Sequence, residues 1–215
     1  MIGYGLSNGL QIQMARRAGE GDNEGLTKTF MNGIMLSVLF ALGLMMLSLW
    51  FAPLLFGLSL SDSTNVFLSI DYLFVRVWGL PFLMLTQLAN AFFISVHKSR
   101  FLIYGALAGT VVNIVFDYLL IFGKFGFPMM GLLGAAAASI LGELTYCATM
   151  YGGYYFNKLY RQYPIHKYLS FDLKLSSRSL RLSSPLIVQY LFSIGGWQIF
   201  FIFLEHLGNP ALAAW

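Results

Sequence analysis

The sequence predicts an all-α protein, a polytopic bundle of transmembrane helices. Of its 215 residues, 58% are apolar and only 10% are charged, whereas soluble domains carry about 25% charged residues. The apolar residues form long blocks, most of them with the roughly 20 residues that a helix needs to cross about 30 Å of hydrocarbon. Lys and Arg concentrate in alternate connections between these blocks, a pattern typical of membrane proteins whose cytoplasmic loops are basic.

The apolar blocks define the elements in chain order. We expect complete spans at 29–56, 67–96, 101–123, 128–155 and 182–207. A further apolar stretch at 1–15 is too short for a complete span before Arg16 and Arg17, and we interpret it as a helix cut short by an internal start or a truncation.

Three parts of the chain follow from these spans. We interpret 1–155 as the helices of an amino-terminal lobe whose first helix is missing, 156–181 as an inter-lobe linker, and 182–215 as the truncated first helix of a carboxy-terminal lobe. The end of the chain, LGNPALAAW, begins a new unit and then stops. We therefore expect a fragment of a longer, transporter-sized protein.

The basic residues predict the orientation. Eleven of the thirteen lie in three alternate connections, which we place in the cytoplasm: Arg16, Arg17, Lys28, Lys98, Arg100, Lys158, Arg161, Lys167, Lys174, Arg178 and Arg181. The linker is then cytoplasmic, with a short amphipathic piece at the membrane interface. We expect 57–66, 124–127 and 208–215 on the outer side, and the span 101–123 to run outward.

The sequence carries no motif of a hydrolase, a metalloprotease or an ATP-driven pump. His97, His166 and His206 are far apart, and His-Glu-x-x-His, Gly-x-Ser-x-Gly and Gly-Lys-Ser/Thr are absent. The basic residues follow the topology and form no single patch, so we expect no nucleic-acid partner. We predict that the protein is not an enzyme and has no cofactor. Transport by such a chain would be passive or driven by an ion gradient.

Asn113 and Asp117 are the candidate functional pair. They lie in the middle of the span 101–123, which has no other charged residue, and a charge inside a bilayer costs roughly 2.5 to 3.5 kcal/mol on insertion scales. Four residues apart on a helix, their side chains point the same way, one turn apart. The pair predicts half of a Na⁺ or proton site. The alternative is a protonated Asp117 that hydrogen-bonds to a neighbouring helix.

Other polar residues in the spans admit two interpretations each. Glu143 is either a second titrating group or the partner of a basic residue, and Arg76 is either paired with Asp71 or reaches the interface as a snorkelling side chain. The recurring polar residues of two spans could line an aqueous cavity, although each alone is more often an interhelical hydrogen bond: Gln87, Asn90, Gln189, Ser193 and Gln198.

The small residues from Gly131 to Ser139 form a smooth ridge that lets two helices approach closely. Because the connection through Gly126 and Pro128 is short, the spans on either side of it must be adjacent and antiparallel. That arrangement would bring Ser139 within reach of the face that carries Asn113 and Asp117.

Several passages together resemble one family, the multidrug and toxic compound extrusion (MATE) transporters. They are QIQMARRAGEGD at 11–22, RVWGLPFLMLTQLANAFF at 76–93, GTVVNIVFDYLLIFGKFGFPMMGLLGAAAAS at 109–139 and SSPLIVQYLFSIGGWQIFFIFLEHLGNPALAAW at 183–215. The resemblance covers essentially the whole chain. It implies a MATE-like bundle of twelve helices, of which this chain holds about six, from the second to the seventh.

The resemblance also implies a function and a ligand set. MATE transporters expel cationic, amphipathic compounds in exchange for Na⁺ or H⁺ by alternating access. Asn113 and Asp117 match the family's cation ligands on the fifth helix, and Ala135 and Ser139 fall where its sixth-helix ligands would be. Ser193 stands where another branch has a Glu, which favours the amino-terminal site.

The implied setting is a bacterial plasma (inner) membrane, with small-molecule substrates and the lipid bilayer as partners and a monomer at full length. Two other functions stay open. A related flippase for lipid-linked precursors would be expected to have a more basic central cavity. A scaffold subunit that transports nothing would explain the helices but not the polar pair.

Overall fold

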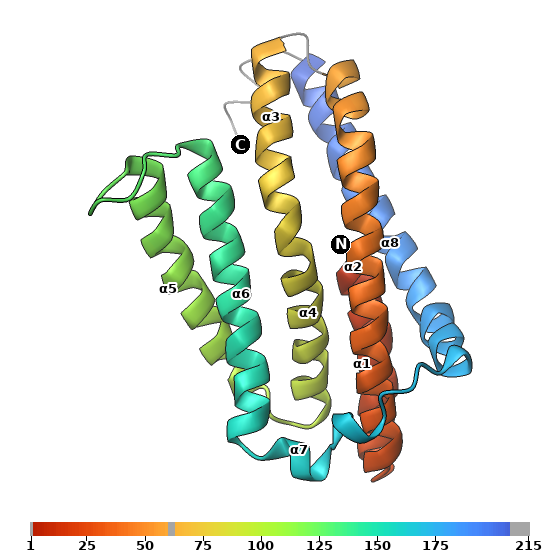
Figure 1. Ribbon diagram of the computed structural model, residues 1–215. Helices are drawn as coiled ribbons and strands as arrows, with labels where there is room; N and C mark the ends of the chain where they lie inside the picture. Colours follow the sequence, from red (N-terminus) through yellow and green to blue (C-terminus); the bar gives the residue numbers. More distant parts are fainter. Residues whose placement is uncertain (1, 60–62, 207–215) are drawn as a thin grey trace.

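The computed structural model describes residues 2–59 and 63–206, and side chains within 3–51 and 67–197. Figure 1 shows a bundle of long helices. In chain order they are α1 (Ile2–Gly19), α2 (Asn23–Ser59), α3 (Ser63–Arg76), α4 (Leu80–Ser95), α5 (Arg100–Phe122), α6 (Leu132–Phe156), the short α7 (Leu159–Gln162) and α8 (Leu173–His206).

The predicted all-α class is confirmed, since the described part of the chain contains no strand. Four of its segments are long and apolar enough to cross a membrane: Asn23–Phe51, Phe67–Ser95, Arg100–Phe122 and Leu132–Phe156. They correspond to the first four predicted spans. The predicted stretches 1–15 and 182–207 are helical in α1 and α8 as far as they are described, but neither is among these four. The predicted outer segment 208–215 lies outside the described residues.

The span predicted at 67–96 is not one continuous α-helix. A 3₁₀ turn, Val77–Gly79, separates α3 from α4, and Pro81 lies in the first turn of α4. Proline fits there because the first turn of a helix leaves its backbone N–H groups without partners inside the helix. The interruption places Arg76 at the end of α3, about one third of the way along the span Phe67–Ser95.

α5 and α6 form a close antiparallel pair, as the short connection between them predicts. Gly123 ends α5 with φ of 63°, a left-handed conformation that glycine adopts without strain. Along the pair, a Cβ placed on Gly109 would lie 2.9 Å from the carbonyl oxygen of Gly142. Only glycine allows the two backbones to approach this closely.

The linker prediction needs correction, because α8 begins at Leu173 instead of 182. Asp172 caps the helix: the backbone N–H groups of Lys174 and Leu175 donate to its Oδ1 at 2.9 and 3.1 Å. The stretch predicted as a short amphipathic piece at the membrane interface therefore forms the first turns of a long helix. Its serines Ser176, Ser179 and Ser183 are buried.

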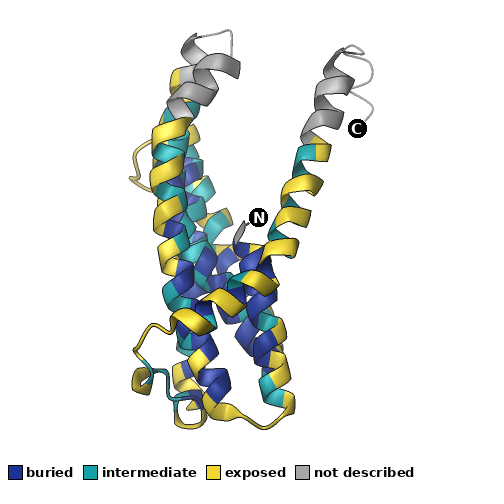
Figure 2. Cartoon of the chain, turned by 90° about the vertical axis from the view of Figure 1, so that its right-hand side faces the viewer, coloured by how far each residue is buried: buried dark blue, intermediate teal, exposed yellow. Residues whose placement is uncertain are grey.

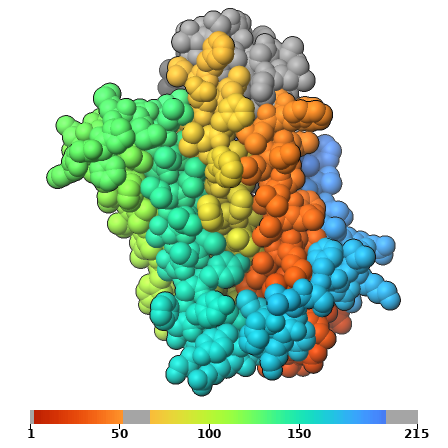
Figure 3. Space-filling view, in the orientation of Figure 1, coloured from red at the N-terminus to blue at the C-terminus, as the bar shows by residue number. Residues whose placement is uncertain are grey.

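The first half of the predicted linker also belongs to the core. Leu159 and Tyr163 are buried, and the Tyr154 hydroxyl donates to the carbonyl oxygen of Tyr163. Tyr163 packs edge-on against Phe92, with ring centroids 5.4 Å apart. In Figure 3 the linker residues, in light blue, lie against the lower ends of α2 and α6.

The connections alternate between the two ends of the bundle. The turns after α1 and α4 and the linker lie at the lower end in Figure 1, and the loop between α5 and α6 lies near the other. This separation matches the predicted grouping of basic connections on one side. Figure 2 shows that the buried residues gather toward the same lower end.

Candidate cation site

A pocket of about 280 Å³ lies where α5, α6 and the end of α3 meet. Its lining includes Asn113 from α5 and Ser139 from α6. As predicted, these two residues lie near each other, because both line the same pocket. Sequence reasoning did not include Thr110 and Tyr146, which also line it. Their spacing was a usable indication, since Thr110 precedes Asn113 by three residues and Tyr146 follows Ser139 by seven, both helical repeats.

The register of α5 against α6 places the other two predicted ligands. Gly109 lies against Gly142, and Leu120 lies against Gly134. Asn113 itself lies against Gly142, so Ser139 is within one helical turn of its level. Asp117, one turn further along α5, then lies at the level of residues 135–138 of α6. Neither Asp117 nor Ala135 is among the residues that line the pocket. The carboxylate is thus one helical turn beyond it, toward the loop that joins α5 and α6.

Asp117 and Asn113 are both partly buried. Within the described part of the chain, neither side chain has a hydrogen bond or an ion pair. The alternative interpretation of Asp117 was a hydrogen bond to a neighbouring helix. No such bond is found among the described residues. An amide, a hydroxyl and a nearby carboxylate supply the hard oxygen ligands that a small cation prefers.

Arg76 and Glu143 form an ion pair at the edge of the same pocket. Arg76 Nη1 donates to Glu143 Oε2 at 2.9 Å, and Nη2 donates to Oε1, so the pair is bidentate. Of the two interpretations left open for Arg76, the pair with Asp71 is wrong, because the carboxylate partner of Arg76 is Glu143. Five residues apart on a helix, the two point about 140° away from each other, and Asp71 is exposed.

Gly79 makes room for this ion pair. A Cβ at this position would collide with the Glu143 carboxylate and the Arg76 guanidinium. Of the two interpretations of Glu143, the structure supports the partner of a basic residue. The side chains of Arg76 and Glu143 are 30% and 18% exposed, so the pair is largely withdrawn from solvent.

The remaining polar candidates do not gather in this pocket. Asn90 accepts a hydrogen bond from the Tyr146 hydroxyl at 3.2 Å, and Gln87 is partly buried on α4. Gln189 and Ser193 are exposed on α8, and the side chain of Gln198 lies outside the described residues. Asn90 thus has the interhelical hydrogen bond that is the commoner role of such residues.

The described residues contain no group of three or more His, Cys, Asp or Glu side chains that could hold a metal ion. The pocket therefore differs from the clustered acidic or histidine sites typical of divalent metals. A monovalent ion or a proton needs only one carboxylate with neutral oxygens nearby. Asn113, Ser139 and Asp117 fit part of such a site.

The fold and the pocket together define a polytopic α-helical membrane protein with polar groups placed between its spans. A sequence profile of the MatE family matches residues 1–119, and the chain belongs to this family. The resemblance found in the sequence is thereby confirmed.

Curated relatives align along the whole chain. A "Probable multidrug resistance protein NorM" of Synechocystis sp. is 28% identical over 100% of this chain and 46% of its own length. A protein of the same name from Rhizobium meliloti is 25% identical, again over 100% of this chain and 46% of its own length. A "Probable multidrug resistance protein YoeA" of Bacillus subtilis is 26% identical over 88% of this chain and 40% of its own length. The chain spans about half the length of the first two relatives.

Solved structures show the same fold. A crystal structure of MATE in the bent conformation superposes with a TM-score of 0.84 at 22% identity, over 99% of this chain and 47% of that one. A MOP superfamily transporter from Pyrococcus furiosus gives 0.80 at 21% identity, over 99% and 46%. An outward-facing multidrug resistance MATE family transporter gives 0.78 at 22% identity, over 88% and 41%. The partial coverage fits an incomplete bundle.

Proposed function

We propose that the protein to which this chain belongs is a secondary active antiporter, which exports cationic, amphipathic compounds in exchange for Na⁺ or H⁺. The observation that carries the proposal is the partly buried, unpaired Asp117, one helical turn from the pocket that Asn113 and Ser139 line. Burying a carboxylate in a membrane span is costly. A carboxylate kept there without a protein partner fits a role in binding a cation.

The coupling follows from charge. Binding of Na⁺ or H⁺ at Asp117 changes the local charge by one unit, which biases the equilibrium between two helix arrangements if one of them holds the ion better. Alternating access then exposes a substrate cavity to opposite sides. We also propose a bacterial inner membrane and a monomer at full length, as membership of the MATE family implies. We assign 156–181 to the cytoplasm because the basic residues concentrate in alternate connections.

Of the two alternatives, the flippase had one supporting residue within the spans, Arg76, and this support is lost. It was expected to have a basic central cavity, and Arg76, its candidate cation, is neutralised by Glu143. A scaffold subunit still explains the helices, but it gives no reason for an unpaired Asp117 between them. The antiporter accounts for both.

The test is efflux of a fluorescent organic cation from cells or proteoliposomes that contain the intact protein, under imposed Na⁺ and pH gradients. We expect Asp117→Asn to lower gradient-driven efflux by about 10- to 100-fold, the usual range of coupling between two sites, with membrane insertion unchanged. Asn113→Ala should weaken the dependence on the ion to a smaller extent, because it removes one neutral ligand.

Asp71→Asn is the matched control, since it removes the same charge from an exposed position on α3. It should leave efflux near the unmodified level. Normal efflux by Asp117→Asn would assign Asp117 a structural role and remove the basis of the antiport proposal. Equal losses in Asp117→Asn and Asp71→Asn would point to a general effect of charge on the fold.

A further inference from the structure

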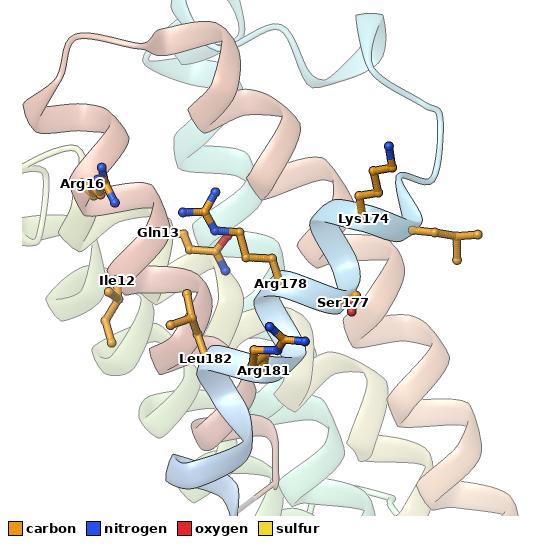
Figure 4. A pocket seen from close by; sticks show the side chains of 9 residues that line it. Ile12, Gln13, Arg16, Lys174, Ser177, Arg178, Arg181 and Leu182 are labelled. Atoms are coloured by element: carbon orange, nitrogen blue, oxygen red, sulfur yellow. The ribbon is translucent and has the colours of Figure 1, made fainter.

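A second, larger pocket of about 770 Å³ lies between α1 and the first turns of α8, at the end of the bundle that we assign to the cytoplasm. Figure 4 shows four basic side chains around it: Arg16 from α1, and Lys174, Arg178 and Arg181 from α8. The proposed transport function does not use this pocket, which is separate from the pocket of Asn113.

The positive charge of the pocket is mostly uncompensated. Arg16 is paired with Glu20, with Nε and Oε1 2.9 Å apart. An adjoining pocket brings the carboxylates of Glu20 and Asp22 near Arg178. Among the residues that the structure describes, however, no carboxylate lies within ion-pair distance of the three basic side chains of α8.

The three α8 residues also share one helix face. Lys174 and Arg178 are four residues apart, and Arg181 follows three residues later, so neighbouring charges repel one another along the helix. Like charges held at this spacing cost stability unless an anion lies between them. Their arrangement can accommodate a ligand with more than one negative group.

The backbone beneath these charges is held firmly. Gln13, only 7% exposed, donates through Nε2 to the hydroxyl of Ser179 at 2.9 Å. One turn further along α8, the Ser183 hydroxyl donates to the carbonyl oxygen of Leu6 at 3.2 Å. These contacts fix the spacing of α1 and α8, so the basic side chains project from a preorganised frame.

The same pocket has an apolar part. Ile12, Leu173 and Leu182 line it, and they are 55%, 74% and 39% exposed. A soluble phosphate would gain nothing from these side chains. A phospholipid would place its phosphates on the basic residues and its acyl chains against the leucines and the isoleucine.

We propose that the pocket between α1 and α8 binds the headgroup of an anionic phospholipid that carries two phosphodiesters. Basic pockets between transmembrane helices on the cytoplasmic side are known to hold such headgroups. Lys174 and Arg181 are seven residues apart, about 10 Å along a helix, and two phosphodiesters span this distance better than one. The lipid would join the first turns of α8 to α1 and stabilise their contact.

The test is native mass spectrometry of the delipidated intact protein titrated with cardiolipin, phosphatidylglycerol or phosphatidylcholine. We expect cardiolipin to bind most tightly. The triple variant Lys174→Gln, Arg178→Gln, Arg181→Gln should lower its affinity on the order of 100-fold, because it removes three charges that contact the bound headgroup. Inorganic phosphate is titrated in parallel, with the melting temperature of the protein as the readout.

A second triple variant, Lys98→Gln, Arg100→Gln, Arg161→Gln, removes the same charges from the same end of the bundle but outside the pocket. It should change cardiolipin affinity by less than about twofold. Equal losses in the two triples would overturn the site in favour of general surface charge. Stabilisation by phosphate as strong as that by cardiolipin would overturn the lipid as ligand. Circular dichroism checks that both triples are folded, and Arg178→Gln alone provides a milder variant if the first triple is not.

Discussion

Arg76 shows how one pairing decides the role of a charged residue inside a membrane span. An isolated guanidinium there is costly, but Glu143 receives two hydrogen bonds from it. The pair has no net charge. The adjacent pocket is then left with the neutral side chains of Asn113 and Ser139, and the unpaired carboxylate of Asp117 lies one helical turn away.

Breaking this pair from one side should destabilise the protein. Glu143→Gln leaves Arg76 as a largely buried, uncompensated charge, and we expect a loss of roughly 2 kcal/mol or more, measured as a lower melting temperature in detergent. The double variant Arg76→Gln, Glu143→Gln removes both charges and should recover most of that loss. A double variant as unstable as the single one would mean that the two groups do not depend on each other.

At the site, the sequence was sufficient for positions along one helix and insufficient for partners between helices. Helical spacing places Asn113 and Asp117 on one face, and the short loop brings Ser139 to the same level. The partner of Arg76 depends on the 3₁₀ turn at Val77–Gly79 and on the absence of a side chain at Gly79. Neither the turn nor the packing that Gly79 permits is visible in hydropathy.

α8 is the element that the sequence described least well. Its first turns are rich in Ser and contain three basic residues, so that in a hydropathy profile they resemble a loop. In the structure, Ser176 and Ser179 donate to carbonyl oxygens one turn earlier, both at 2.8 Å. Their hydroxyls also accept from Asn32 and Gln13. Small hydroxyl residues thus form the face of α8 that contacts α1 and α2. Hydropathy does not reveal such a face, although it located the strongly apolar spans correctly.

The contact of α1 with α8 rests on glycine. A Cβ on Gly9 would lie 2.9 Å from the Cα of Ser183, so Gly9→Ala must push the two backbones apart. We expect a destabilisation of about 1 to 3 kcal/mol from this overpacking, seen as a lower melting temperature.

Gly43→Ala is the control, because nothing lies within 4 Å of a Cβ at that position. It should be neutral or slightly stabilising, since Ala favours a helix over Gly. Equal effects of the two changes would show that helix propensity, not the contact, is responsible.

For the whole molecule, burial is unequal between the two ends. The buried core gathers at the end with the linker, and at the other end α8 stands apart from α2 and α3 (Figure 2). Along that part of α8, Leu191, Phe192 and Trp197 are 52%, 77% and 58% exposed. Among the described residues, the outer part of α8 makes few contacts, whereas its first turns pack against α1. Motion of the outer part of α8 relative to α5 and α6 would therefore break few contacts.

This asymmetry predicts where a coupling ion should change the shape of the protein. Cys147, the single cysteine of this chain, is first replaced by Ala. Spin labels on Lys124→Cys, just after α5, and on Phe192→Cys, in α8, then report the distance between these elements by double electron–electron resonance. We expect Na⁺ or acid to shift the distance distribution. An ion that binds one arrangement about 1.4 kcal/mol more tightly changes the population ratio tenfold. In an Asp117→Asn background the distribution should no longer respond, because the group that distinguishes the two states is gone. A response that persists there would place ion sensing elsewhere in the full-length protein.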